Sequence, residues 1–173
     1  MYNAFAEVYD RLQDADYAKF ADYYERIFEK YGIKPELVLD LACGTGNITV
    51  PMSQRGYDMI GVDLSVEMLN IAREKAQAAG QNILFINQDM TEFELYGTVD
   101  AILCALDGVN YLTADGETDE LFRLAENYLN PGGLMIFDIN TEYKLREVLG
   151  SNTFVNEEQG IYNYHGKIRK IRF

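Results

Sequence analysis

The sequence predicts an α/β fold: a doubly wound, mostly parallel sheet with helices on both faces. Two observations support this prediction. Short apolar runs alternate with segments of helical spacing, and the runs are almost continuously apolar. Such strands are buried on both faces, because right-handed crossovers place helices on either side of a parallel sheet. The five runs expected to be strands cover residues 37–42, 58–62, 83–86, 99–105 and 134–139.

Segments with helical spacing separate the first three runs. Residues 17–31 carry bulky side chains three and four positions apart, which predicts an amphipathic N-terminal helix, and a helix-like segment ends near Arg55. After the second run, Ser65 is the expected N-cap of a helix that ends near Gly80. Its inward positions are expected to be Met68, Leu69, Ala72 and Ala76.

Two further helices complete the alternation. Residues 118–129 place apolar side chains on one helical face, and residues 131–133, Pro-Gly-Gly, are expected to end this helix. The fifth run leads to a short helix whose inward positions are expected to be Tyr143, Leu145 and Leu149.

The composition is that of one soluble globular domain, with 173 residues, 48% hydrophobic and 25% charged. Its formal net charge of −13 repels phosphate backbones and anionic membrane surfaces, so neither nucleic acid nor a membrane is an expected partner. The sequence has no transmembrane run and no signal-peptide pattern, which predicts a cytoplasmic location. Cys43 and Cys104 lie in apolar stretches and are expected to be buried structural thiols.

Residues 1–150 contain no internal repeat, low-complexity tract or linker, so we expect them to form one domain. Residues 151–173 are expected to be a strand-like tail. In doubly wound sheets, ligands bind beyond the carboxyl ends of the strands. The residues that follow each apolar run are therefore the site candidates.

The first run ends in VLDLACGTG, residues 38–46. Gly44 and Gly46 allow a ligand to approach the backbone closely, with an ordinary tight turn as the alternative. A dinucleotide-binding loop would carry a third glycine where Thr49 stands, and Asp40 would disfavour an anionic pyrophosphate. The loop is therefore expected to suit a cationic ligand.

Acidic residues also follow the second and third runs. Asp63 stands where a carboxylate can accept hydrogen bonds from both ribose hydroxyls of an adenosine, and a helix-initiating aspartate is the alternative. Asp89, beside Met90, is expected to accept a hydrogen bond from an adenine amine, unless it is a solvated loop residue. The fourth run is expected to lead into a polar pocket wall that includes the Ala105 carbonyl, Asp107, Asn110 and Tyr111.

Four motifs in this order resemble those of class I S-adenosylmethionine-dependent methyltransferases, in particular the small soluble bacterial type. They are VLDLACGTG, GVDLS, QDM and DAILCALDGVNYL, and the N-terminal YNAFAEVYD is also similar. The resemblance covers residues 1–150. It implies a Rossmann-like fold, S-adenosylmethionine as cofactor, and a small molecule as methyl acceptor.

The resemblance further implies residues that hold the methionine portion, the ribose, the adenine, and the open side of the pocket. The family often has glycine where Ala42 stands, and alanine still leaves room for the ligand. The implied residues are Asp40, Ala42, Gly44, Gly46 and the Ala105 carbonyl for the methionine portion; Asp63 for the ribose; Leu64, Asp89 and Met90 for the adenine; and Tyr9 and Tyr17 for the open side of the pocket.

The tail departs from the family, in which two further strands give the sheet order 3-2-1-4-5-7-6. Only 23 residues follow Gly150, too few to supply these strands and the insertions that accompany them. We expect either that the chain is incomplete at its C-terminus, or that another subunit, as in a homodimer, covers the missing edge.

Methyl transfer requires mainly that a nucleophile be aligned with the methyl–sulfur bond, which predicts direct in-line displacement. No residue spacing suggests a metal site. The candidate proton acceptors are Asp107, Tyr111 and His165. Two other functions stay open: a non-catalytic module that binds S-adenosylmethionine or S-adenosylhomocysteine, and an NAD-dependent oxidoreductase.

Overall fold

A computed structural model describes residues 9–10, 15–148, 150, 153–157 and 161–165. The chain divides into two compact units, Met1–Asp138 and Ile139–Phe173. The first contains a five-stranded sheet and the second a two-stranded sheet. The domain boundary expected at residue 150 stays a prediction.

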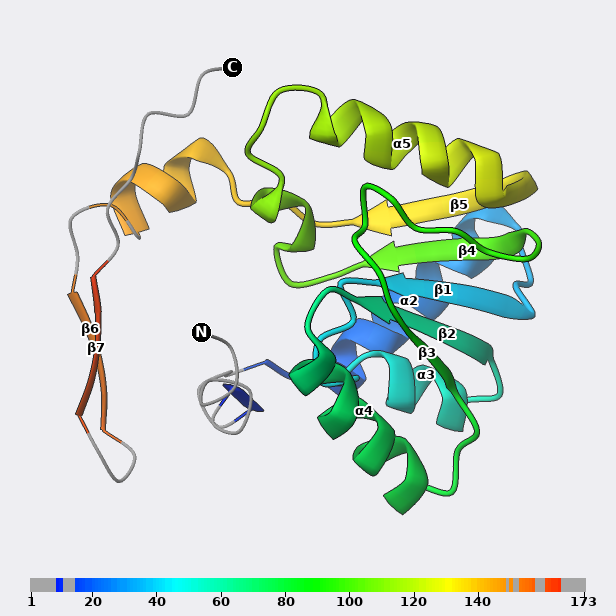
Figure 1. Ribbon diagram of the computed structural model, residues 1–173, viewed down its shortest axis with the longest axis horizontal. Helices are drawn as coiled ribbons and strands as arrows, with labels where there is room; N and C mark the ends of the chain where they lie inside the picture. Colours follow the sequence, from blue (N-terminus) through cyan, green and yellow to red (C-terminus); the bar gives the residue numbers. More distant parts are fainter. Residues whose placement is uncertain (1–8, 11–14, 149, 151–152, 158–160, 166–173) are drawn as a thin grey trace. The chain divides into compact units, whose positions relative to one another are not determined.

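The first unit is built around a parallel sheet with the strand order β3-β2-β1-β4-β5 (Figure 1). All four strand pairings in this sheet are parallel, which confirms the predicted fold class. Strand order reverses between β1 and β4, so the crevice beyond their carboxyl ends is the usual place for a ligand. The strands are β1 (Leu37–Leu41), β2 (Asp58–Asp63), β3 (Leu84–Asn87), β4 (Val99–Cys104) and β5 (Leu129–Phe137).

Helices begin and end largely where the sequence predicts. Ser65 caps α4, since its hydroxyl accepts a hydrogen bond from the Met68 amide at 3.3 Å. The four expected inward residues of α4 are the four that are buried. Asp16 caps α2 by accepting a hydrogen bond from the Lys19 amide at 3.2 Å. The helices of this unit are α2 (Tyr17–Tyr31), α3 (Thr49–Gln54), α4 (Val66–Ala78), the 3-10 helix η1 (Gly108–Tyr111) and α5 (Glu117–Tyr128).

Two apolar layers cover the sheet. Val38 and Leu39 are both fully buried although they point to opposite faces, as expected for a central parallel strand. On the Val38 face, the core includes residues of α2 and α3, and on the Leu39 face it includes residues of α5. A third cluster joins α4 to β3 through Leu69, Ala72 and Phe85. This packing holds the strand ends in fixed positions.

The fifth strand begins earlier than the sequence predicts. Leu129 already pairs with Val99, the next pair joins Leu134 to Ala101, and residues 130–133 form an irregularity between them. The Pro-Gly-Gly segment therefore lies within β5 rather than before it. Gly132, with φ of 84°, permits the bend. The prediction that residues 131–133 separate helix from strand was wrong, because local turn chemistry does not reveal a bulge inside a ladder.

The second unit contains a π-helical segment, η2 (Lys144–Val148), followed by the antiparallel strands β6 (Thr153–Glu157) and β7 (Ile161–His165). Tyr143 is 71% exposed, so its predicted inward position was wrong. Leu145 is half-buried, and Leu149 lies outside the described residues. Helical spacing identifies a face of a helix but does not show whether another surface covers that face. Among the described helices, none has the length and apolarity needed to cross a bilayer.

Candidate functional site

A cavity of about 510 Å³ opens at the carboxyl ends of β1, β2, β3 and β4. This volume lies in the range of about 300–1,000 Å³ common for small-molecule sites. The predicted site residues that line it are Tyr9, Asp40, Ala42, Gly44, Asp63, Leu64, Asp89, Met90, Ala105 and Tyr111. Of the other predicted residues in the described part of this unit, Tyr17, Gly46, Asp107 and Asn110 are not in the lining.

The loop after β1 has an unusual backbone. Ala42, Gly44 and Gly46 have φ of 54°, 55° and 76°, in the left-handed region. A Cβ atom on Gly44 would meet no atom within 4 Å, so this position favours glycine only because of its backbone conformation. A Cβ atom on Gly46 would lie 3.1 Å from the Cβ of Ala72 in α4. Gly46 thus lets the loop pack on α4, while Gly44 faces the cavity.

Asp63 fixes the ends of two segments. Its Oδ2 accepts a hydrogen bond from the Gly44 amide and its Oδ1 one from the Ser65 amide, both at 2.8 Å. Each carboxylate oxygen has a second lone pair, so the group can still accept donors from a ligand. Burial raises the pKa of Asp63, and the two amide hydrogen bonds oppose this rise. The carboxylate is therefore held in place before any ligand arrives.

Asp40 is almost completely buried, with 2% of its surface exposed. Its Oδ2 accepts a hydrogen bond from the Thr49 hydroxyl at 2.6 Å. Burial raises the pKa of Asp40 to about 7, the Thr49 hydrogen bond lowers it, and the nearby Asp63 carboxylate raises it. The residue that replaces the third glycine of a dinucleotide loop is thus the hydrogen-bond partner of Asp40. In the sequence, Thr49 stands out only as the absence of a glycine, and its hydrogen bond to Asp40 is not apparent.

The ends of β2 and β3 form a second wall of the cavity. Leu64 is 68% exposed, although it is a large apolar residue at the mouth of a cavity. The Asn87 amide nitrogen donates to the carbonyl oxygens of Asp63 and Leu64 at 2.9 and 2.8 Å, which fixes this turn. Asp89 Oδ1 accepts hydrogen bonds from the backbone and the hydroxyl of Thr91 at 2.8 and 2.7 Å. The Asp89 side chain is therefore oriented by its own loop.

The turn after β4 holds two consecutive non-glycine residues in the left-handed region, Leu106 and Asp107, with φ of 56° and 65°. The Asp107 amide donates to Asp138 Oδ2 at 3.0 Å, which ties this turn to the end of β5. Burial raises the pKa of Asp138. Of the two candidate proton acceptors in this turn, Tyr111 lines the cavity and Asp107 does not.

Both cysteines are buried free thiols, as the sequence predicts. Burial, together with the nearby Asp40 and Asp138 carboxylates, raises the pKa of Cys104 to about 12. A Cβ atom on Gly108 would lie 2.6 Å from Cys104 Sγ, so this thiol fills the space beneath the turn after β4. Cys104 therefore packs as an apolar residue.

Tyr9 brings the N-terminal segment to the cavity. Burial raises the pKa of Tyr9 to about 12, with further contributions from Tyr17, Tyr111, Asp10 and Asp63. The phenol therefore stays protonated at neutral pH. Tyr17 begins α2 and is half-buried, and its pKa is also raised by burial. The predicted aromatic pair thus lies at this end of the unit, with Tyr9 in the cavity lining.

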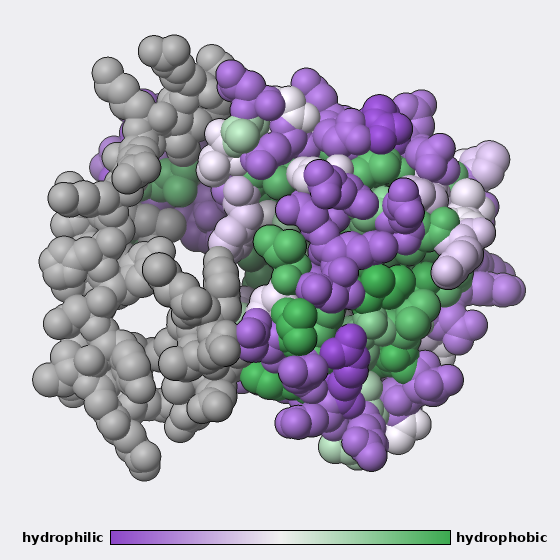
Figure 2. All heavy atoms as spheres, viewed as in Figure 1, coloured by the Kyte–Doolittle hydropathy of each residue, from purple (hydrophilic) through white to green (hydrophobic). Residues whose placement is uncertain are grey.

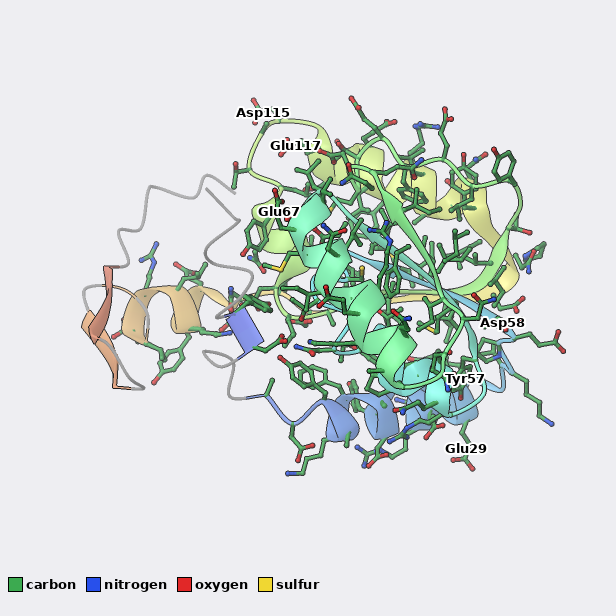
Figure 3. The ribbon with its side chains drawn as sticks, turned by 60° about the horizontal axis from the view of Figure 1, so that its bottom comes forward. Glu29, Tyr57, Asp58, Glu67, Asp115 and Glu117 are labelled. Atoms are coloured by element: carbon green, nitrogen blue, oxygen red, sulfur yellow. The ribbon has the colours of Figure 1, made fainter. Side chains whose placement is uncertain are left out.

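Two carboxylates of the cavity were not among the residues predicted from the sequence. Glu67 lies in the first turn of α4 and Glu117 in the first turn of α5. Figure 3 shows both at one end of the unit, away from Tyr57 and Asp58 at the other end. Acidic residues directly after a helix N-cap were the available signal, because strand ends and helix starts meet at the same edge of such a sheet.

The cavity is strongly acidic. Among its described lining residues there are five carboxylates and no lysine, arginine or histidine. The carboxylates are Asp40, Asp63, Glu67, Asp89 and Glu117. Hydrophilic residues also cover much of the surface in Figure 2, interrupted by groups of apolar ones. This site suits a cation with hydroxyl donors and a flat apolar part, which is the chemistry of S-adenosylmethionine.

A family model for methyltransferase domains matches residues 38–133. The chain is 36% identical over 163 residues to a Bacillus subtilis protein named "Putative methyltransferase YqeM", covering 93% of this chain and 64% of the relative. A second relative of the same description, from Geobacillus, is 33% identical over 162 residues, covering 92% of this chain and 66% of the relative. The chain thus spans about two thirds of the length of these curated relatives.

The solved structures agree with this match. The crystal structure of an S-adenosylmethionine-dependent methyltransferase from Clostridium acetobutylicum superposes with a TM-score of 0.87 and 35% sequence identity. The alignment covers 98% of this chain and 70% of that structure. From its sheet order, its acidic cavity and these similarities, the chain belongs to the S-adenosylmethionine-dependent methyltransferase family.

Proposed function

We propose that this chain transfers the methyl group of S-adenosylmethionine to a small-molecule acceptor by direct in-line displacement. The supporting observation is the cavity at the strand ends, whose described lining includes five carboxylates and no cationic side chain. S-adenosylmethionine carries a positive sulfur, which such a field stabilises. The volume of about 510 Å³ lies within the range of small-molecule sites.

The lining residues divide the work of binding. Asp63 accepts the ribose hydroxyls on its remaining lone pairs, because its backbone donors, Gly44 and Ser65, use only one lone pair on each oxygen. The exposed Leu64 side chain offers an apolar surface to the adenine ring. Asp89 and Met90 border the adenine edge. The Ala105 carbonyl oxygen accepts a hydrogen bond from the ammonium group of the methionine portion.

When bound, S-adenosylmethionine supplies an electrophilic methyl group. The protein then has to orient the acceptor and exclude water, and no covalent enzyme intermediate is needed. Tyr9 contributes a neutral phenol to the cavity wall. Tyr111 is the candidate proton acceptor that lines the cavity, and Asp107 is the one held beside Asp138. His165 is the last residue of β7 in the second unit.

The two alternatives are less well supported. An NAD-dependent oxidoreductase would place a diphosphate in the acidic cavity, without a cationic partner in its described lining. Thr49 stands at the position where such a loop needs its third glycine, and its hydroxyl donates a hydrogen bond to Asp40. A non-catalytic binding module needs the same cofactor contacts and differs only in lacking turnover.

The expected partners follow from charge and cavity size. A net charge of −13 disfavours nucleic acid, so we retain the small-molecule acceptor. The homodimer and the cytoplasmic location also stay predictions.

The test is titration calorimetry of the purified chain with S-adenosylmethionine, S-adenosylhomocysteine and NAD. We expect micromolar binding of the first two and no heat from NAD. Binding of NAD alone would overturn the proposal. The chain is then incubated with methyl-labelled S-adenosylmethionine and pools of small hydroxyl, amine and acid acceptors. Transfer of the label to an acceptor and formation of S-adenosylhomocysteine are both measured. Cofactor binding with no turnover on any pool would favour the binding module.

A further inference from the structure

Four polar side chains from three separate segments form a closed hydrogen-bonded group beside the cavity. Asp10 comes from the N-terminal segment, Thr45 and Asn47 from the loop after β1, and Lys75 from α4. Lys75 Nζ lies 2.6 Å from Asp10 Oδ2, and the side chains of Lys75 and Asp10 are 30% and 35% exposed. We call these four residues the Asp10 cluster.

The donors and acceptors of the Asp10 cluster match one another. Asp10 Oδ1 accepts the Thr45 hydroxyl at 2.6 Å and the Asn47 amide nitrogen at 2.8 Å. Lys75 Nζ donates to Thr45 Oγ1 at 3.0 Å and to Asn47 Oδ1 at 2.5 Å, in addition to Asp10. All three ammonium hydrogens therefore have acceptors in the cluster. Burial raises the pKa of Asp10, but the hydrogen bonds from Lys75, Thr45 and Asn47 bring it below its usual value.

The Asp10 cluster holds two walls of the cavity at once. Asp10 directly follows Tyr9, whose side chain lines the cavity, and Thr45 and Asn47 are themselves lining residues. Thr45 is only 1% exposed, so its hydroxyl needs the partners that the cluster provides. Lys75 connects these walls to α4, the helix that Ser65 caps at the Asp63 end.

Among the described residues of the first unit, the other ion pairs do not have this arrangement. Arg55 pairs with Asp22 and Glu25, which joins the end of α3 to α2, and none of the three lines the cavity. Arg123 pairs with Glu120 within α5, and both side chains are well exposed. The Asp10–Lys75 pair, in contrast, joins the N-terminal segment to α4, and both residues also bind the lining residues Thr45 and Asn47 of the glycine loop.

We propose that Asp10 and Lys75 are positioning residues for cofactor binding, which set Tyr9 and the loop residues Thr45 and Asn47 in their binding geometry. This proposal rests on the proposed function, because the ligand concerned is S-adenosylmethionine. Neither residue touches the cofactor in this proposal. Their effect passes through the residues that they orient.

The first test measures the Kd of S-adenosylmethionine for Asp10→Asn and Lys75→Gln. Each change removes one charge from a partly buried, charge-assisted cluster, and we expect each to raise Kd about tenfold. The double variant should raise Kd little more than either single change, because both remove the same interaction. The matched control is Glu120→Gln with Arg123→Gln, which removes an exposed ion pair and should leave Kd unchanged.

Two further variants separate positioning from simple stabilisation of the fold. The reversed pair, Asp10→Lys with Lys75→Asp, should recover part of the lost affinity, since Thr45 and Asn47 can each both donate and accept. In a Tyr9→Ala background, Asp10→Asn should raise Kd by less than the tenfold expected in the wild type, because the part of its effect that passes through Tyr9 is already lost. A lower melting temperature with an unchanged Kd in both single variants would overturn the proposal.

Hydrogen exchange of the cofactor-free protein tests the proposal independently of binding. The amides of residues 44–48 should exchange faster in Asp10→Asn and Lys75→Gln than in the wild type, and not in the α5 control. Unchanged exchange at these amides would overturn the positioning role. If the wild type fails to bind S-adenosylmethionine, the proposed function fails, and the exchange result still decides whether the cluster orders the loop.

Discussion

The Thr49 hydroxyl donates a hydrogen bond to Asp40 Oδ2 at 2.6 Å, and both residues are buried, one on each side of the glycine loop. Thr49 is the first residue of α3, and Asp40 is the fourth residue of β1. The bond therefore joins the strand to the helix that follows it. It also lowers the pKa of a carboxyl group that burial raises to about 7.

Replacing Thr49 by Val should destabilise the protein more at pH 8 than at pH 5.5. At pH 8 the change leaves a buried, ionised carboxylate without the hydroxyl donor, a loss of about 1–3 kcal/mol in the free energy of unfolding. Thr49→Ser keeps the donor and serves as the control. Urea unfolding at both pH values measures the effect, and an equal loss at both would show that Thr49 acts through packing alone.

Asp40 should make the protein less stable as pH rises from about 5 to about 8. Burial raises its folded-state pKa from 3.8 to about 7, so the folded protein binds the proton more tightly than the unfolded chain does. The stabilisation is present at pH 5 and is lost as pH rises through about 7, a change of roughly 2–3 kcal/mol. Urea unfolding of wild type and Asp40→Asn at pH 5 and pH 8 isolates this contribution. We expect the variant to lose less stability across this interval, and a parallel decrease would contradict the raised pKa.

The affinity for S-adenosylmethionine should rise between pH 6.0 and pH 7.5. A cationic ligand favours the ionised form of Asp40, whose pKa in the free protein is about 7. The ionised fraction then increases roughly five- to tenfold over this interval, and Kd should fall by up to that factor. Calorimetry at several pH values measures this change. A flat profile is expected for Asp40→Asn, and the same slope in that variant would assign the titration to another group.

Asp63→Ala should weaken S-adenosylmethionine binding by about 1–3 kcal/mol, because the ribose hydroxyls lose their acceptor and the Gly44 amide loses its partner. Asp58→Ala is the matched control, since Asp58 is an exposed aspartate at the other end of the same strand (Figure 3). Calorimetric Kd values of both variants are compared with the wild type. Equal small effects would remove Asp63 from the proposed site.

Gly46→Ala should destabilise the fold more than Gly80→Ala. Both glycines have positive φ, 76° and 68°, so both variants lose about 1–2 kcal/mol to backbone strain. Only at Gly46 would the new methyl group meet Ala72, at 3.1 Å, whereas Gly80 has open space. Urea unfolding of the two variants therefore separates the packing contribution from the strain. Equal losses would mean that the loop can move away from α4.

The local pattern of the sequence was sufficient for most of the sheet and helices. Continuous apolar runs marked the strands, because a parallel strand is buried on both faces, and Ser65 marked a helix start because its hydroxyl satisfies a free amide. The acidic residues at successive strand ends were also visible, since parallel strands bring their carboxyl ends to one edge. These features depend on residues that are neighbours in the chain.

Which polar groups meet depends on the folded chain. Thr49 as the partner of Asp40, Asp138 as the acceptor for the Asp107 amide, and Lys75 as the partner of Asp10 all join different segments. The bulge at residues 130–133 likewise depends on pairing with β4. Hydrophobic periodicity and end caps act locally, so the residue pattern alone identified which segments become strands and helices. The hydrogen bonds across the site required the packed chain, because their geometry exists only when distant segments are brought together.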